Sequence, residues 1–184
     1  IVGVQFRNLA TVGGSIYGRY GFSDVLTMFL AMDSYVELYK GGIIPLREYV
    51  KMPYDRDILV RLIVKKEKAA FDYQSVRNTQ NDFPVLTCAS AKTEGGYRFS
   101  IGARPGKAVL FELDDADIQA ADVENTAKNA VKCVKEQIET GSNTRGSAEY
   151  RKHLAEVLVK RAVCKLAGKQ KRELPSAKPM RSMV

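Results

Sequence analysis

Residues 84–103 read PVLTCASAKTEGGYRFSIGA, and this stretch decides the fold. Two β-prone runs, residues 84–92 and 96–103, are joined at Thr93-Glu94-Gly95-Gly96, whose paired glycines suit a hairpin turn that needs positive φ. A third such run covers residues 107–113. The pattern predicts a small antiparallel sheet of three strands.

Downstream of these strands the hydrophobic period changes to that of two amphipathic helices, over residues 122–140 and 147–168. Asp122 and Ser147 are the predicted N-caps. The apolar face predicted for the second helix comprises Tyr150, Leu154, Val157, Leu158, Ala162 and Leu166. Strands followed by a pair of antiparallel helices indicate an α+β domain, with the helices covering one face of the sheet.

Upstream of the hairpin, residues 11–21 form a glycine-punctuated segment, followed by an apolar helix over residues 25–32. Four further strands are predicted over residues 35–39, 43–46, 57–66 and 70–77, with a brief helical turn near residues 47–50. With 45% hydrophobic and 27% charged residues, the 184-residue chain can bury a core. No apolar run is long enough to span a membrane.

The net charge of +8 is concentrated at the C-terminal end, where residues 165–184 carry a surplus of five basic residues. This distribution favours a solvated basic tail, from about residue 169, over a nucleic-acid-binding surface on the folded body. Cys88, Cys133 and Cys164 are scattered in apolar settings, which predicts reduced core thiols in a cytoplasmic protein. No metal site or iron–sulfur cluster is expected in this chain, because the common clusters need four grouped ligands.

The segment with chemical content is Thr11-Val12-Gly13-Gly14-Ser15, called the glycine loop below. Adjacent glycines let a phosphate approach backbone N–H groups, and the two hydroxyls add donors. A surface turn is the alternative for this pattern taken by itself. Ser23 or Asp24 can cap the next helix, and the Asp24 carboxylate can also accept hydrogen bonds from a ribose or ribityl hydroxyl. No nucleophile, base or triad pattern is present, so no catalytic residue is expected and any chemistry is assigned to a cofactor.

Residues 4–37, VQFRNLATVGGSIYGRYGFSDVLTMFLAMDSYVE, resemble the second half of the FAD-binding domain in flavoprotein subunits of molybdenum hydroxylases. This family includes xanthine dehydrogenase and the medium subunit of carbon monoxide dehydrogenase. It carries the pattern R-N-x-A-T-x-G-G-(N/S)-I and then Ser-Asp ten residues on. Residues 146–162 resemble its Ser-x-x-Tyr-Arg helix, and residues 81–85 resemble the entry to its C-terminal sheet.

The resemblance implies that Thr11, Gly13, Gly14 and Ser15 line the pyrophosphate of FAD and that Asp24 contacts the flavin or its ribityl chain. It also places Leu59 as an apolar wall beside the flavin. A lysine of the family falls at Gln74, a departure that makes this position a weaker flavin contact.

The fold implied is α+β, with residues 1–65 as the C-terminal part of a split FAD-binding domain. Residues 66–184 are then a C-terminal domain of the carbon monoxide dehydrogenase flavoprotein type, a small antiparallel sheet covered by helices. The implied function is an oxidoreductase subunit that relays electrons through FAD to NAD or another acceptor. The implied partners are a large subunit with molybdopterin and a small ferredoxin-like subunit with 2Fe-2S centres.

The family also carries an earlier glycine loop, A-G-G-x-x-L, which this sequence lacks. We therefore expect the chain to be the C-terminal two thirds of such a subunit, with an FAD site that is half built. The alternative is a cofactor-free fragment or interaction module that docks on the other subunits.

Overall fold

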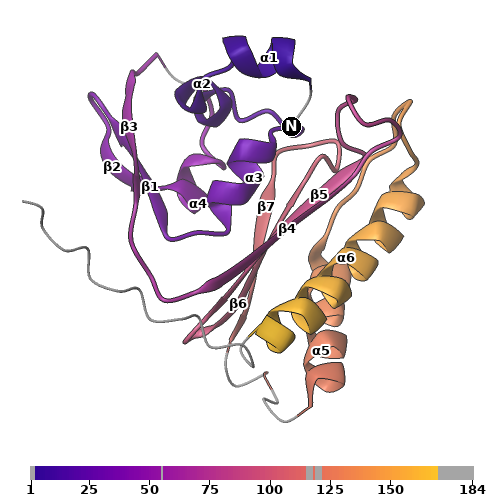
Figure 1. Cartoon of the computed structure of the whole chain (residues 1–184). Coiled ribbons are helices and arrows are strands. Elements are labelled where there is room, and N and C mark those ends of the chain that lie inside the picture. The colour runs from indigo at the N-terminus through magenta and orange to yellow at the C-terminus, as the bar shows by residue number, and fades with distance from the viewer. Residues whose placement is uncertain (1–2, 55, 115–117, 119–121, 170–184) are drawn as a thin grey trace, which may run out of the picture.

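The computed structural model describes residues 3–54, 56–114, 118 and 122–169. The first part of the chain forms α1 (Val4–Leu9), α2 (Val12–Tyr17), α3 (Asp24–Leu30), β1 (Ser34–Leu38), β2 (Gly42–Pro45), α4 (Leu46–Tyr49) and β3 (Leu59–Val64). The second part forms β4 (Ala70–Val76), β5 (Leu86–Thr93), β6 (Gly96–Gly102), β7 (Val109–Asp114), α5 (Val123–Gln137) and α6 (Ala148–Lys169). The strands make two antiparallel sheets, ordered β2-β1-β3 and β4-β5-β6-β7 (Figure 1).

The β5–β6 hairpin is confirmed, with Thr93 opposite Gly96 and Gly96 at φ 137°. A side chain at Gly96 is excluded both by this φ and by the backbone of β7. The prediction of three strands was wrong by one, because β4 pairs with β5 along its whole length, from Ala70 opposite Lys92 to Val76 opposite Leu86. The sheet therefore has four strands, and β4 is its edge.

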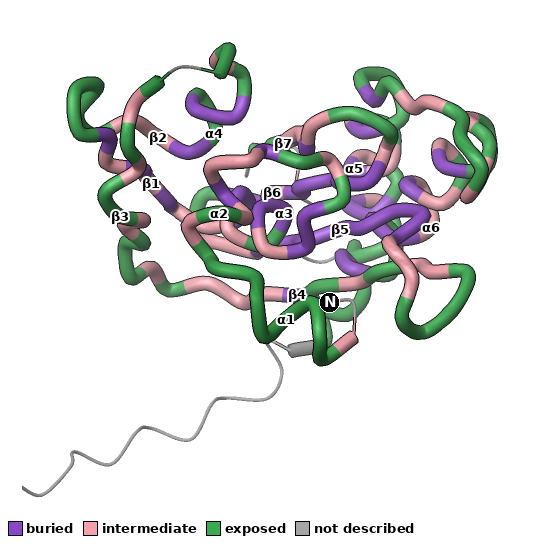
Figure 2. The backbone as a smooth tube through the Cα atoms, turned by 90° about the horizontal axis from the view of Figure 1, so that it is seen from above, coloured by how far each residue is buried: buried purple, intermediate pink, exposed green. Residues whose placement is uncertain are grey.

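Both faces of the four-stranded sheet are covered, so its central strands β5 and β6 are almost entirely buried (Figure 2). Helices α5 and α6 pack on one face, which carries the large side chains of the main core, among them Leu86, Tyr97, Phe99, Ile101 and Phe111. Helix α3 packs on the other face, against β5, β6 and β7. Alternate residues of a strand point to opposite faces, which is why one strand serves both layers.

The face toward α3 is built from small residues, which let the helix come close. Thr27 of α3 and Thr87 of β5 place their hydroxyl oxygens 3.3 Å apart, and both are fully buried. A Cβ atom at Gly102 would overlap both of these hydroxyls. Gly21, just before α3, accepts a backbone hydrogen bond from Ala103, and a Cβ atom there would overlap the carbonyl oxygen of Gly106.

The two predicted C-terminal helices are confirmed, each with its expected cap: Asp122 accepts from the Asn125 N–H and Ser147 from the Tyr150 N–H. The predicted face of α6 was rotated. Tyr150 is 46% exposed and Leu154 only partly buried, whereas the fully buried residues include Arg151, Ala155, Leu158, Val159, Ala162, Val163 and Leu166. Apolar spacing alone missed the rotation because a buried arginine takes the place of an apolar residue at the start of this face.

Arg151 is the buried cation of α6, in the segment that resembles the Ser-x-x-Tyr-Arg helix, and it closes the loop between the helices. Its Nε donates to the Val85 carbonyl at 2.9 Å, Nη1 to the Gly141 carbonyl at 2.7 Å and Nη2 to Asn143 Oδ1 at 2.6 Å. Burial, with the nearby charge of Arg145, lowers the pKa of Arg151. Five donors in a fixed fork suit this bonding to several carbonyls, which lysine cannot reproduce.

Two short helices were not predicted, α1 and α2. The second of them includes the glycine pair, since Thr11 caps it and Gly13 and Gly14 take helical conformation despite their low propensity. The prediction of core thiols holds for Cys88, whose pKa burial raises to about 12. It was wrong for Cys164, which is exposed, and Cys133 is half-buried. The basic tail lies outside the described residues beyond position 169.

None of the described helices has the length and apolar character needed to cross a membrane.

We expect Leu158→Ala to lower the free energy of unfolding by about 2–5 kcal/mol, because the leucine is 2% exposed between the sheet and α5. Lys160→Ala, on the exposed side of the same helix, should change it by less than about 0.5 kcal/mol. Urea unfolding of both variants measures the difference. Equal midpoints for Leu158→Ala and wild type would contradict this packing.

Candidate functional site

The glycine loop is a tight capped turn that opens α2. Thr11 has extended backbone angles, and its Oγ1 accepts from the Gly14 N–H at 3.0 Å. The Ser15 N–H bonds to the Thr11 carbonyl at 3.0 Å. The N–H groups of Val12 and Gly13 belong to the first turn of the helix, where no intrahelical acceptor exists.

The space in front of the loop is open on the side of Gly13. A Cβ atom built at Gly13 meets nothing within 4 Å, whereas one at Gly14 would lie 3.0 Å from Thr11 Oγ1. Thr11 and Gly14 are exposed, and Gly13 and Ser15 are half-buried. First-turn N–H groups, two hydroxyls and a glycine surface without side chains form a donor set that fits a phosphate group.

A second turn, at Ser23 and Asp24, is hydrogen-bonded directly to the glycine loop. Ser23 caps α3, as its Oγ accepts from the Leu26 N–H at 3.1 Å. The same hydroxyl donates to the Ser15 carbonyl at 3.2 Å. The sequence left open whether Ser23 or Asp24 caps the helix, and the structure assigns the cap to Ser23.

Asp24 follows this cap as the first residue of α3, and its side chain is turned toward the four-stranded sheet. Nη2 of Arg77, just after β4, lies 2.7 Å from Oδ1 and 2.8 Å from Oδ2 of Asp24. The Tyr73 hydroxyl also donates to Oδ1. The ion pair is buried, with side chains 8% exposed for Asp24 and 12% for Arg77. Burial first, and then the charge of Asp24, raise the pKa of Tyr73, so the phenol stays protonated as a donor.

The two remaining residues of the predicted site lie differently. Leu59 of β3 is partly buried and packs against the core cluster that includes Ile16 of α2, so it belongs to the same side of the molecule as the glycine loop. Gln74 faces away from that side. Its Nε2 donates to Asp72 Oδ2 at 2.9 Å and to the Leu158 carbonyl of α6 at 3.3 Å.

Sequence reasoning missed Tyr73 and Arg77, which both donate hydrogen bonds to Asp24. The signal that was available is the parity of β4: Asp72 and Gln74 point to α6, so Tyr73 and Arg77 point to α3. Parity selects the face but not the partner, because Asp24 and Arg77 are 53 residues apart in the chain.

Residues 81–85, the predicted entry to the C-terminal sheet, adjoin this ion pair. Arg77 Nη1 donates to the Asp82 carbonyl at 2.7 Å, and the Asp82 carboxylate pairs with Arg145 at 3.0 Å. The hydrogen bond from Arg145 is the largest cause that lowers the pKa of Asp82. Next to it the Phe83 ring contacts Phe6 and Phe22. Polar and aromatic contacts thus join the entry segment to the chain on either side of the glycine loop.

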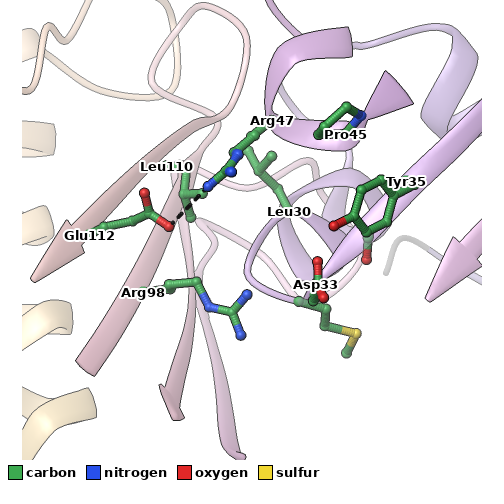
Figure 3. Close-up of a pocket in the computed structure, with 10 residues that line it drawn as sticks. Leu30, Asp33, Tyr35, Pro45, Arg47, Arg98, Leu110 and Glu112 are labelled. Atoms are coloured by element: carbon green, nitrogen blue, oxygen red, sulfur yellow. Dashed lines mark ion pairs between the residues drawn. The ribbon is translucent and has the colours of Figure 1, made fainter. Parts of the chain in front are cut away.

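A separate cavity of about 60 Å³ lies between the two sheets (Figure 3). Its lining includes Ser34 and Arg98, whose Oγ and Nε atoms are buried without a hydrogen-bond partner. Arg98 pairs with Glu67, and Nη1 of Arg47 lies 3.5 Å from Oε1 of Glu112, so both arginines of the lining have an acidic partner. A space of this size and polarity suits ordered water. The glycine loop does not line it, and we assign it no cofactor.

Comparison with known proteins accounts for both halves of the chain. Residues 1–66 match the family model described as the FAD binding domain in molybdopterin dehydrogenase. Residues 71–166 match the CO dehydrogenase flavoprotein C-terminal domain. The uncharacterized protein YgfM of Escherichia coli K12 is 27% identical over 168 residues, covering 89% of this chain and 62% of YgfM.

Two solved structures show the same fold. A CO dehydrogenase from Oligotropha carboxidovorans superposes with a TM-score of 0.76 at 18% identity, over 91% of this chain and 64% of the other. Quinoline 2-oxidoreductase from Pseudomonas putida 86 superposes with a TM-score of 0.75 at 18% identity, over 94% of this chain and 65% of the other. The chain thus spans somewhat less than two thirds of the length of these relatives.

The surroundings of Gly13 and Gly21 predict opposite effects of an alanine substitution on the free energy of unfolding. Gly13→Ala should leave the free energy of unfolding unchanged or raise it by up to about 1 kcal/mol, since its Cβ enters open space and alanine favours helix. Gly21→Ala should lower it by about 1–3 kcal/mol, because the Gly106 backbone must move. Thermal and urea unfolding compare the two, and a stability loss at Gly13 as large as that at Gly21 would contradict the open geometry of the loop.

Proposed function

Because the chain belongs to the family of FAD-binding flavoprotein subunits of molybdopterin-dependent dehydrogenases, we propose that it holds FAD by its glycine loop. The observation that carries the proposal is the loop's geometry: Thr11 closes the turn while Gly13 leaves its N–H side open. Backbone donors beside a missing side chain are the groups a pyrophosphate needs. Such a subunit acts within an oxidoreductase.

The roles of the individual residues follow from where they lie. Thr11, Gly13, Gly14 and Ser15 are proposed to line the pyrophosphate, with Leu59 as an apolar wall on the same side of the molecule. Asp24 is proposed to act at the flavin end from the neighbouring turn, which Ser23 bonds to the loop. Gln74 is left out, because it donates to α6 on the far face of the sheet.

Bound FAD would supply the change between two-electron and one-electron transfer, and the chain supplies binding and orientation. We propose that electrons reach this subunit from an iron–sulfur subunit, that a molybdopterin subunit oxidises the substrate, and that NAD or another acceptor receives the electrons. We further propose residues 1–65 and 66–184 as the two domains, joined along the contact of α3 with the four-stranded sheet.

A second candidate is a cofactor-free module that docks on other subunits. The observation in its favour is the exposure of apolar side chains on and beside α1: Phe6 is 47%, Leu9 88% and Val12 51% exposed (Figure 2). Apolar residues grouped on a surface are typical of an interaction site. Flavin titration separates the two candidates, because docking needs no affinity for FAD.

We expect FAD fluorescence to be quenched saturably by the chain, and Gly13→Val to weaken this binding at least tenfold, because a branched side chain fills the space in front of the N–H groups. Gly168→Ala is the matched control, as its Cβ also enters open space but in α6. The apparent Kd of the three proteins is measured at equal concentrations. Equal affinity of Gly13→Val and wild type would refute the assignment of the loop.

We also expect the 184-residue chain to retain much less than one FAD per chain after desalting. It carries one glycine loop, and each set of phosphate hydrogen bonds that a site lacks costs a few kcal/mol, with about 1.4 kcal/mol for each tenfold loss. Flavin absorbance per chain after gel filtration measures retention. Stoichiometric FAD in the purified chain would show that these residues suffice for tight binding.

A further inference from the structure

We propose that Arg77 is a positioning residue for the glycine loop, acting on it through Asp24 and Ser23. The link between this effect and FAD rests on the function proposed above. The positioning itself is a property of the apoprotein. If Arg77 has this role, the C-terminal part of the chain helps to position a site whose proposed binding residues all lie in the N-terminal part.

The first step of the link is the buried ion pair between the two parts of the chain. A single nitrogen of Arg77, Nη2, donates to both oxygens of Asp24, and Tyr73 donates to one of them. Removing one partner of a buried pair leaves the other charge without compensation. Asp24 would then have to move toward solvent.

The second step runs from Asp24 to the loop. Asp24 is the first residue of α3 and directly follows its cap, Ser23. The Ser23 hydroxyl donates to the Ser15 carbonyl, at the end of the glycine loop. A displacement of Asp24 therefore disturbs the hydrogen bond between the Ser23 hydroxyl and the Ser15 carbonyl. None of the side chains of residues 11–15 is buried, so none of them can take over from this bond.

The third step is that Arg77 itself is held in place by the sheet and by the segment that follows β4. It follows β4, which is paired with β5 over seven positions, and the Val85 N–H bonds to the Val76 carbonyl at 2.8 Å. Its other terminal nitrogen, Nη1, donates to the Asp82 carbonyl at 2.7 Å. The guanidinium is thus held from two sides before it reaches Asp24, so it can impose a position rather than follow one.

The test is amide hydrogen exchange of the apoprotein, followed by mass spectrometry of peptides covering residues 11–26. Arg77→Gln should raise exchange in these peptides at least tenfold relative to peptides of α6. The matched control is Arg98→Gln: Arg98 lies on the same face of the same sheet and is similarly buried, but its ion pair is with Glu67. It should leave residues 11–26 within twofold of wild type.

Two further variants grade the effect. Arg77→Lys should restore protection only in part, because an ammonium can contact both oxygens of Asp24 but loses the Nη1 bond to the Asp82 carbonyl that holds the guanidinium in place. Tyr73→Phe removes one donor and should give a smaller increase than Arg77→Gln. If Arg77→Gln does not fold, Asp24→Asn removes the same ion pair and should expose the same peptides.

The FAD arm of the experiment separates this inference from the proposed function. Arg77→Gln should raise the apparent Kd for FAD at least tenfold and Arg98→Gln less than twofold. Absence of saturable FAD binding by the wild type would refute the proposed function, while exchange would still decide the positioning. Unchanged exchange at residues 11–26 in Arg77→Gln, or an equal rise in Arg98→Gln, would overturn the role of Arg77.

Discussion

The burial of the four-stranded sheet on both faces is the constraint on which the rest of the structure depends. Large side chains fill the side toward α5 and α6, whereas small residues such as Thr87 and Gly102 let α3 come close on the opposite side. Gly102 shows how strict this is, since any Cβ would overlap the hydroxyls of Thr27 and Thr87. The close approach of α3 brings the two parts of the chain into one body and sets where the glycine loop lies.

Close approach of a helix to a sheet also brings polar groups out of water, and they must find partners at the contact. Asp24 pairs with Arg77 and accepts a hydrogen bond from Tyr73, and the hydroxyls of Thr27 and Thr87 bond to each other. On the other face, Gln74 donates to the Leu158 carbonyl of α6, and the Cys88 thiol contacts the Ser90 hydroxyl. These pairings fix the distance of α3 from the sheet and the rotation of the helix about its own axis. Apolar packing against small residues would fix both less strictly.

For the proposed function, the consequence is that the glycine loop is held by residues outside it. Residues 11–15 are largely exposed and lie in a helix of six residues with its cap, too short to be stable alone. Besides Ile16, which α2 buries in the adjoining core, the Ser23 hydroxyl fixes their position and links them through Asp24 to the end of β4. An exposed loop on a rigid support is a common arrangement for ligand binding, because the loop must be accessible and its geometry must be fixed.

The sequence by itself determined what local chemistry dictates: the β5–β6 hairpin from its paired glycines and the helix caps at Asp122 and Ser147. Local pattern was insufficient where a residue's role is set by a distant partner. The rotation of α6 follows from Arg151 reaching Val85, the fourth strand from pairing of β4 with β5, and the orientation of Gln74 from the parity of that strand. Only the tertiary structure decided that Asp24 meets Arg77, because a buried charge selects its partner by proximity after folding, and proximity across 53 residues leaves no periodic trace in the sequence.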